Sequence, residues 1–150
     1  MACDKESKIT TQALWEQLFE APSISSFLSD ADSRNLPAFA DYLQERAERK
    51  GERPETIIRR SNLDSSFGHR LFGGTRNPSR DTVLQLAFGF ELTADEAQLL
   101  MKIARVTALH PKVQRDAVIA YGLHHQLTLV ETQQLLYECG LPLIGGAKHE

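Results

Sequence analysis

Histidine and serine side chains are the first places to look for metal binding or nucleophilic catalysis. His124 and His125 are adjacent, so on a helix they point about 100° apart and cannot share a metal as an i,i+4 pair would. Ser65 and Ser66 have no neighbouring His or Asp in a nucleophile motif, and no glycine loop resembles a phosphate cradle. We therefore expect no metal site, no cofactor and no enzymatic activity.

The two cysteines, Cys3 and Cys139, lie at opposite ends of the 150-residue chain. They cannot build a disulfide framework, and neither His110 nor Cys139 has the spacing of a zinc ligand. This usage predicts a reducing, cytoplasmic environment. The first ten residues lack the apolar core of a signal peptide, and the apolar runs are too short to span a bilayer, so we expect no membrane segment.

Positive charge is concentrated in the middle of the chain. The whole sequence has a net charge of -3, but residues 34–90 contain ten Lys and Arg against seven Asp and Glu. Residues 1–33 and 91–150 are both acidic. A basic stretch alone is more often a solvated surface than a nucleic-acid site, so the elements that carry it decide between the two.

Almost every segment has the apolar spacing of an amphipathic helix, and strand-like alternation is absent. The composition, with 41% hydrophobic and 25% charged residues, is that of an ordinary globular protein. We find no clear internal repeat. The predicted helices span about 10–20, 22–28, 38–50, 54–61, 64–72, 79–90, 93–107, 111–125 and 128–139, which makes the chain all-α.

Residues with known preferences for helix ends mark these boundaries. Two capping boxes, Thr93 with Glu96 and Thr128 with Glu131, predict the starts of two helices. The other residues expected to start, stop or connect helices are Pro37, Gly51, Pro54, Asn62, Asp64, Gly73, Gly74, Ser79 and Pro111.

Residues 51–90 have the order of a helix-turn-helix: a short helix, a three-residue turn, a second short helix and a Gly-Gly stop. A loop, Gly-Thr-Arg-Asn-Pro-Ser, and an amphipathic helix follow. The stretch GERPETIIRRSNLDSSFGHRLFGGTRNPSRDTVLQLAFGF resembles the lambda-repressor-like helix-turn-helix family of bacterial and phage regulators, the XRE or Cro/CI class. The loop matches the family closely, and the resemblance covers about residues 36–92.

The resemblance implies a transcriptional regulator, a repressor or an activator, that binds operator DNA as a homodimer. The second helix of the motif would lie in the major groove. By position, the residues facing the bases would be Ser65, Ser66, His69 and Arg70, of which only Arg70 could make a bidentate contact to guanine. Residues near the phosphates would be Arg76, Asn77 and Ser79, with further contacts from Arg49, Lys50 and Arg53.

An alternative interpretation keeps the fold without the DNA. Many relatives have Gln where this chain has Pro54, which offers a phosphate neither a polar side chain nor an amide proton. Gly68 stands where relatives have an aliphatic core residue. Together with the acidic flanking helices, these differences favour a protein–protein interaction module that modulates a regulator or a signalling enzyme. Small-molecule sensing by the C-terminal helices has no pocket signal in the sequence.

The predicted organisation has four segments: a helical segment 1–35, the helix-turn-helix domain 36–92, a helical extension 93–144 and a frayed tail 145–150. Helices 10–20 and 128–139 should pack on the basic domain or across a two-fold axis. The residues expected in the core are Trp15, Phe19, Phe39, Leu43, Ile57, Leu63, Phe67, Leu71, Leu86, Phe88 and Phe90.

Overall fold

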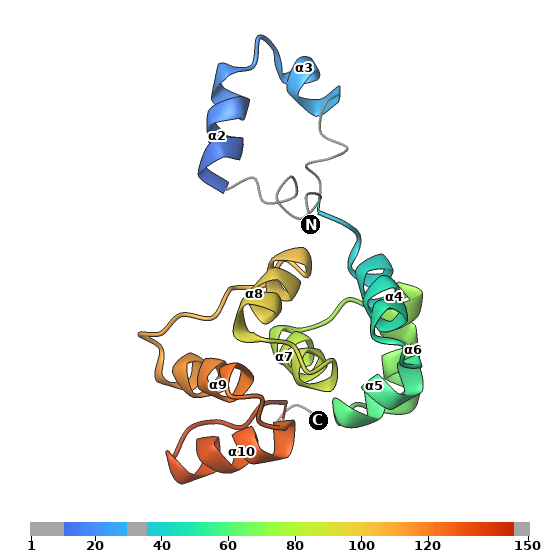
Figure 1. The fold of residues 1–150 in the computed structure, drawn as a ribbon, viewed down its shortest axis with the longest axis vertical. Coiled ribbons are helices and arrows are strands. Elements are labelled where there is room, and N and C mark those ends of the chain that lie inside the picture. Colours follow the sequence, from blue (N-terminus) through green and yellow to red (C-terminus); the bar gives the residue numbers. More distant parts are fainter. Residues whose placement is uncertain (1–10, 30–35, 146–150) are drawn as a thin grey trace. The chain divides into compact units, whose positions relative to one another are not determined.

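The described part of the chain is entirely helical. A computed structural model describes residues 11–29 and 36–145, and these ranges contain nine helices and no strand (Figure 1). The fold is all-α, as predicted. Within the same ranges, no helix combines the length and the apolar content needed to cross a membrane. The helices are α2 (Thr11–Glu20), α3 (Ile24–Ser29), α4 (Phe39–Lys50), α5 (Pro54–Arg60), α6 (Ser65–Gly73), α7 (Arg80–Gly89), α8 (Ala94–Ile103), α9 (Gln114–His124) and α10 (Leu129–Glu138).

The chain divides into two compact units, Met1–Leu36 and Pro37–Glu150. In the first unit, α2 and α3 contain no buried residue. The rings of Trp15 and Phe19 stack with their centroids 5.6 Å apart. Both residues are nevertheless exposed, Trp15 over 52% of its surface and Phe19 over 76%. The prediction that both belong to a core is wrong, because helices of ten and six residues are too short to enclose them.

Local signals set the ends of the helices at the start of the second unit. Gly51 and Gly74, with φ of 73° and 84°, end α4 and α6 in the left-handed conformation. Asn62, in the turn between α5 and α6, has φ of 58°. The side chain of Asp64 accepts a hydrogen bond from the backbone amide of Phe67 at 3.1 Å and caps α6, as predicted.

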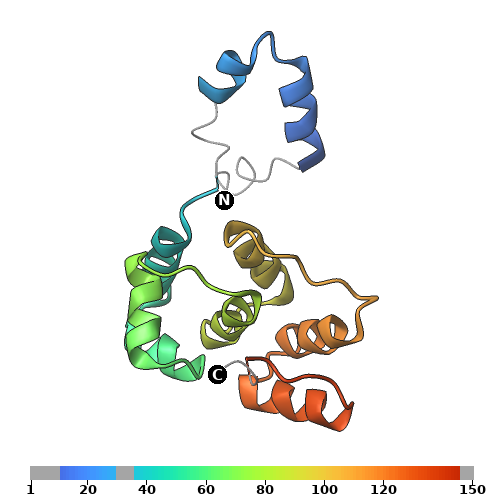
Figure 2. The ribbon, with the colours of Figure 1, turned by 180° about the vertical axis from the view of Figure 1, so that it is seen from behind.

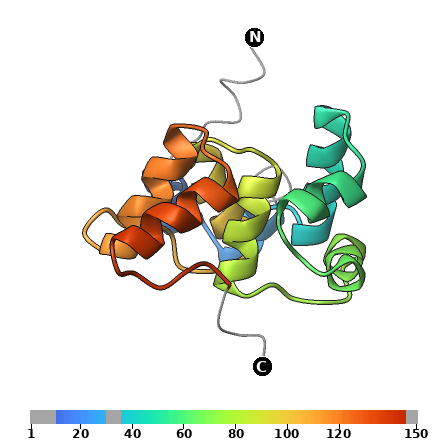
Figure 3. The same ribbon diagram turned by 90° about the horizontal axis from the view of Figure 1, so that it is seen from below.

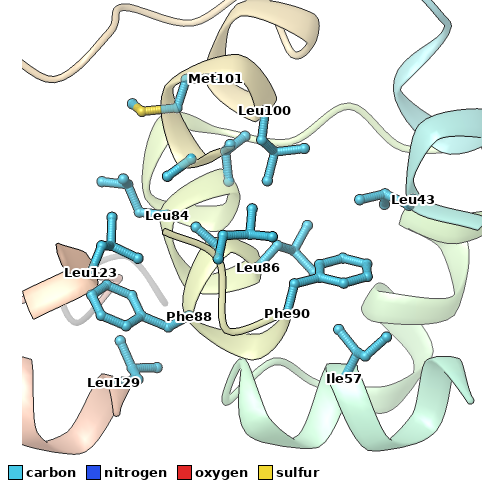
Figure 4. Packing of buried hydrophobic residues seen from close by; sticks show 14 of the residues in the cluster. Leu43, Ile57, Leu84, Leu86, Phe88, Phe90, Leu100, Met101, Leu123 and Leu129 are labelled. Atoms are coloured by element: carbon cyan, nitrogen blue, oxygen red, sulfur yellow. The ribbon is translucent and has the colours of Figure 1, made fainter. Parts of the chain in front are cut away.

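One apolar core runs through the second unit, with α7 at its centre (Figure 4). Every residue from Thr82 to Gly89 is buried. Helices α4, α5 and α6 lie on one side of α7, and α8, α9 and α10 lie on the other (Figures 1, 2 and 3). As expected, α10 packs on α7. The predicted core residues confirmed as buried are Leu43, Ile57, Leu71, Leu86, Phe88 and Phe90.

Three predicted core residues are only partly buried. Phe39 is the first residue of α4, and Leu63 lies in the turn before α6, so neighbouring helices do not surround either side chain. The ring of Phe67 lies near the surface, with the guanidinium of Arg76 over one of its faces. Each remains in contact with the core at its edge.

Helices α7–α8 and α9–α10 form an internal repeat of 35 residues, so the expectation of no repeat is wrong. Both α8 and α10 begin with a complete capping box. The junctions inside each repeat turn through a residue with left-handed φ, Glu91 at 60° and Gln126 at 58°. The equivalent pairs include Arg80 and Arg115, Asp81 and Asp116, Thr93 and Thr128, Glu96 and Glu131, and Gln98 and Gln133.

The two repeats contact each other reciprocally: the arginine at the start of each repeat binds the aspartate at the start of the other. Arg80 binds the carboxylate of Asp116 at 2.9 and 3.2 Å, and Arg115 binds that of Asp81 at 3.1 and 3.2 Å. Each arginine also donates to two backbone carbonyls that follow the second helix of its own repeat, at 2.9 and 3.1 Å for Arg80 and 2.9 and 2.8 Å for Arg115. This reciprocity is that of an approximate two-fold axis within one chain.

Two predicted helix boundaries are wrong. The helix expected to reach residue 107 ends at Ile103, because Arg105 has φ of 63° and the amide of Val106 donates back to the carbonyl of Met101 at 3.1 Å. The helix expected to begin at Pro111 begins at Gln114.

The predicted terminal segments are described only in part. Positions 1–10 and 30–35 of the segment 1–35, and positions 146–150 of the tail, lie outside the described residues. At the start of the tail, the amide of Gly145 donates to the carboxylate of Asp81 at 2.8 Å.

Candidate nucleic-acid interface

One face of α6 carries small polar and basic side chains. The opposite face is anchored in the core by Leu71 and Phe72. The four residues predicted to face DNA bases are all exposed: Ser65, Ser66, His69 and Arg70. Their spacing places Ser65 beside His69, and Ser66 beside Arg70, one turn further along the helix. The side chain of Arg70 makes no ion pair or hydrogen bond with any described residue, so its guanidinium is available to a ligand.

The loop after α6 brings Arg76 back against the same helix. Its guanidinium carbon lies 5.2 Å from the centroid of the Phe67 ring, and Phe67 directly follows Ser66 in α6. An arginine stacked on an aromatic ring keeps the N–H groups at its edge free for an acceptor. The sequence predicts that Arg76 lies near the DNA backbone. It does not predict that Phe67 supports Arg76, because only the path of the loop brings these residues together.

The other two loop residues predicted near a phosphate differ in their bonding. The Ser79 hydroxyl accepts from the backbone amide of Thr82 at 3.2 Å, and it lies 3.0 Å from the Thr82 hydroxyl. It is therefore committed to capping α7, as its predicted role as a helix start requires. Asn77 is exposed, and its side chain makes no hydrogen bond with a described residue, so it remains available.

Three cations near the junction of α4 and α5 are predicted to contact phosphates, and acidic neighbours neutralise them to different degrees. The ammonium of Lys50 lies 3.0 Å from the carboxylate of Glu91, so a phosphate would have to compete with this pair. Arg49 pairs with Glu45 at 3.3 Å on an exposed helix face, where such pairs contribute little and exchange easily. Arg53 is exposed and has no ionic partner among the described residues.

The guanidinium of Arg60 is bound within the fold and is not available to a DNA phosphate. It donates to both carboxylate oxygens of Glu52, and its Nε donates to the carbonyl of Gly89 at 3.0 Å. The hydrogen bond from Arg60 lowers the pKa of Glu52, and the same bond raises the pKa of Arg60. The pair therefore stays charged and ties the end of α5 to the end of α7.

Acidic residues stand at the N-terminal ends of both short helices. Glu55 lies in the first turn of α5, Asp64 caps α6, and both are exposed. Their charges stabilise the helices through the helix dipole but oppose a phosphate at the same ends. Of the arginines predicted to contact DNA, those without an ionic partner among the described residues are therefore Arg53 before α5, Arg70 near the end of α6 and Arg76 in the loop after it.

No cluster of three or more His, Cys, Asp or Glu that could hold a metal occurs in the described ranges. Cys139 is a free, exposed thiol, and Cys3 lies outside those ranges. No protein-family model, curated protein or solved structure matches the chain. The geometry of α6 and of the loop after it therefore carries the functional assignment.

Proposed function

We propose that the chain is a transcriptional regulator in which α5 and α6 form a helix-turn-helix and α6 enters the major groove of operator DNA. The resemblance of residues 36–92 to the lambda-repressor-like family supports this assignment. The observation that carries it is the exposed polar face of α6, where Arg70 has no ionic partner among the described residues and Phe67 supports the stacked guanidinium of Arg76. The proposal includes a cytoplasmic, bacterial or phage setting and a homodimer, and it needs no cofactor.

Arg70 and Arg76 have different roles in this proposal. The planar guanidinium of Arg70 can donate two hydrogen bonds to O6 and N7 of one guanine, which is sequence-specific. Arg76 lies in the loop before α7, where its charge contacts a phosphate and adds affinity without specificity. Ser65, Ser66 and His69 contact base edges on the same face, while Asn77 and Arg53 contact the DNA backbone.

Selection from a random duplex library at low salt tests the proposal. The wild-type protein should enrich one sequence with two half-sites, and sedimentation should show two chains on each duplex. Arg70→Ala should cost about 1–3 kcal/mol and relax the preference at one base pair. Arg76→Ala should weaken binding to all duplexes alike and lower the salt slope by about one. The control Lys102→Ala removes an equal charge at an exposed position of α8 and should change neither the base preference nor the salt slope.

A protein-binding function is the second candidate, favoured by the pairing of Lys50 with Glu91 and by the acidic ends of α5 and α6. It predicts that no duplex is enriched and that Arg70→Ala matches wild type on every duplex. A protein recovered with the wild-type chain should then be lost with Arg70→Ala but kept with Lys102→Ala. That combination would contradict DNA binding.

A further inference from the structure

A half-open cavity of about 630 Å³ lies in the second unit, and no residue of α6 lines it. Three parts of the chain form its walls: the end of α5 with the following turn, the end of α7, and the junction of α9 and α10. The volume is typical of sites for small molecules. No pattern in the sequence predicts the cavity, because these walls are far apart along the chain.

The cavity is lined by apolar side chains of two kinds: those at its floor are buried, and those along one wall are at least partly exposed to solvent. Phe88, Leu123 and Leu129 meet at the floor and are almost fully buried (Figure 4). Leu127 is half-buried, and Val130 at the start of α10 is 77% exposed. An apolar molecule in the cavity would remove both of these side chains from water, which is favourable.

Residues of both repeats line the cavity, but the exposed apolar side chains are specific to the second repeat. Leu127 corresponds to Leu92, which is 1% exposed in the first repeat. Val130 corresponds to Asp95, an exposed carboxylate. At the same position on α8 and α10, one repeat therefore carries a charged group suited to water and the other carries an aliphatic side chain beside a cavity.

Arg59 supplies the only uncommitted charge among the lining residues. Arg60 and Glu91 also line the cavity, but Arg60 is bound to Glu52, and Glu91 is bound to Lys50 at 3.0 Å. Arg59 is exposed and makes no ion pair or hydrogen bond with a described residue. A free guanidinium at the rim of an apolar cavity favours a ligand with one negative group.

We propose that this cavity binds a small amphipathic carboxylic acid. Its aliphatic part covers Leu127 and Val130, and its carboxylate binds the guanidinium of Arg59. Asn62 in the turn after α5 also lines the cavity, and its side-chain amide supplies a further donor at the rim. Binding at this site does not require that α6 bind DNA, so the two proposals are tested independently of each other.

Octanoate and 1-octanol, which share a chain length and differ in charge, are the probes. When they are titrated into the isotope-labelled full chain, octanoate should shift the backbone amide resonances of residues 123–130 and of the α5–α6 turn. Its affinity should exceed that of 1-octanol about tenfold, as a charge-assisted hydrogen bond allows. Arg59→Gln should remove this preference, whereas Arg105→Gln, at an exposed arginine outside the cavity, should preserve it.

Val130→Asp provides a second variant, because it copies Asp95 of the first repeat at an exposed position where folding is not at risk. It should abolish octanoate binding while the circular dichroism spectrum stays unchanged. Equal affinity for the two probes, shifts confined to other surfaces, or octanoate binding unaffected by both Arg59→Gln and Val130→Asp would overturn the proposal. Absence of any shift at roughly 10 mM octanoate would do the same.

Discussion

Gly68 lies in the middle of α6, where a glycine costs about 0.5–1 kcal/mol relative to alanine. A Cβ atom at this position would lie 2.5 Å from Cγ2 and 2.7 Å from Cγ1 of Ile58 on α5. Ile58 is 2% exposed, so its branched side chain has little room to move. Overpacking of this kind costs about 1–3 kcal/mol, more than alanine would gain in the helix. Close packing of α5 on α6 therefore requires the glycine that departs from the family pattern.

We predict that Gly68→Ala lowers the free energy of unfolding by about 1–3 kcal/mol in urea denaturation. Gly73→Ala in the same helix is the control, since no described residue beyond its own helix backbone and chain neighbours lies within 4 Å of a Cβ there, and stability should stay constant or rise. In an Ile58→Ala background, Gly68→Ala should be harmless. Equal effects of the two glycine substitutions would contradict the close approach.

Individual residues of the candidate site were predictable where a local rule fixes them. The exposure of Ser66 and Arg70 follows from helical periodicity once Leu71 is placed in the core, and Ser79 caps α7 by a local hydrogen bond. The neutralisation of Lys50 by a residue forty-one positions later was not predictable. Such partners are set by the packing of distant helices rather than by sequence spacing.

At the scale of elements, the pairing of α9 with α10 has a sharp steric requirement. A Cβ at Gly122 would lie 3.0 Å from Cγ2 of Thr132 and would overlap its hydroxyl oxygen. The Thr132 hydroxyl has no hydrogen-bond partner among the described residues, so its removal costs little. The equivalent positions of the first repeat hold Ala87 and Ala97, both fully buried. A glycine with a larger partner in one repeat thus corresponds to two alanines in the other.

Gly122→Ala alone should therefore destabilise the protein by about 1–3 kcal/mol through overpacking. The double variant Gly122→Ala with Thr132→Ala recreates the alanine pair of the first repeat and should recover most of this loss. A double-mutant cycle from urea denaturation measures the coupling. Strictly additive effects on the free energy of unfolding would show that the side chains at positions 122 and 132 do not compete for the same volume.

The reciprocal ion pairs between the repeats should contribute unequally. The Asp116 side chain is 5% exposed, whereas that of Asp81 is 30% exposed. Arg80→Met would leave Asp116 charged and buried without its cation, which costs about 3–5 kcal/mol. Arg115→Met should cost less, because water reaches Asp81. Thermal unfolding of the two variants compares them directly, and the opposite order would contradict the described burial.

The helix ends were largely predictable, but the repeat was not. Asp64, Thr93 and Thr128 bond within three residues of themselves, so their sequence context alone specifies the caps. The sequence does not predict the end of α8, because Arg105 adopts a left-handed conformation that Gly normally marks. The two halves of the repeat share a few polar residues and only three identical apolar positions, where Val83, Leu92 and Leu100 recur as Val118, Leu127 and Leu135. The contacts between the halves become visible only in three dimensions.

At the scale of the whole molecule, the two units differ in what stabilises them. The buried apolar residues of the described ranges all lie between Tyr42 and Ile144, whereas α2 and α3 contain none. The second unit therefore contains a complete core of its own. A unit with its own core is expected to fold independently.

We predict that a fragment of residues 37–150 unfolds cooperatively on its own, as measured by circular dichroism. Trp15 is the only tryptophan of the chain and is 52% exposed. Its fluorescence in the full chain should therefore change little while the helical signal, which comes mostly from the second unit, is lost. A large red shift of the tryptophan emission that coincides with the helical transition would contradict this, because it would place Trp15 in the cooperative core. A fragment without a cooperative transition would show that residues 37–150 need the first unit to fold.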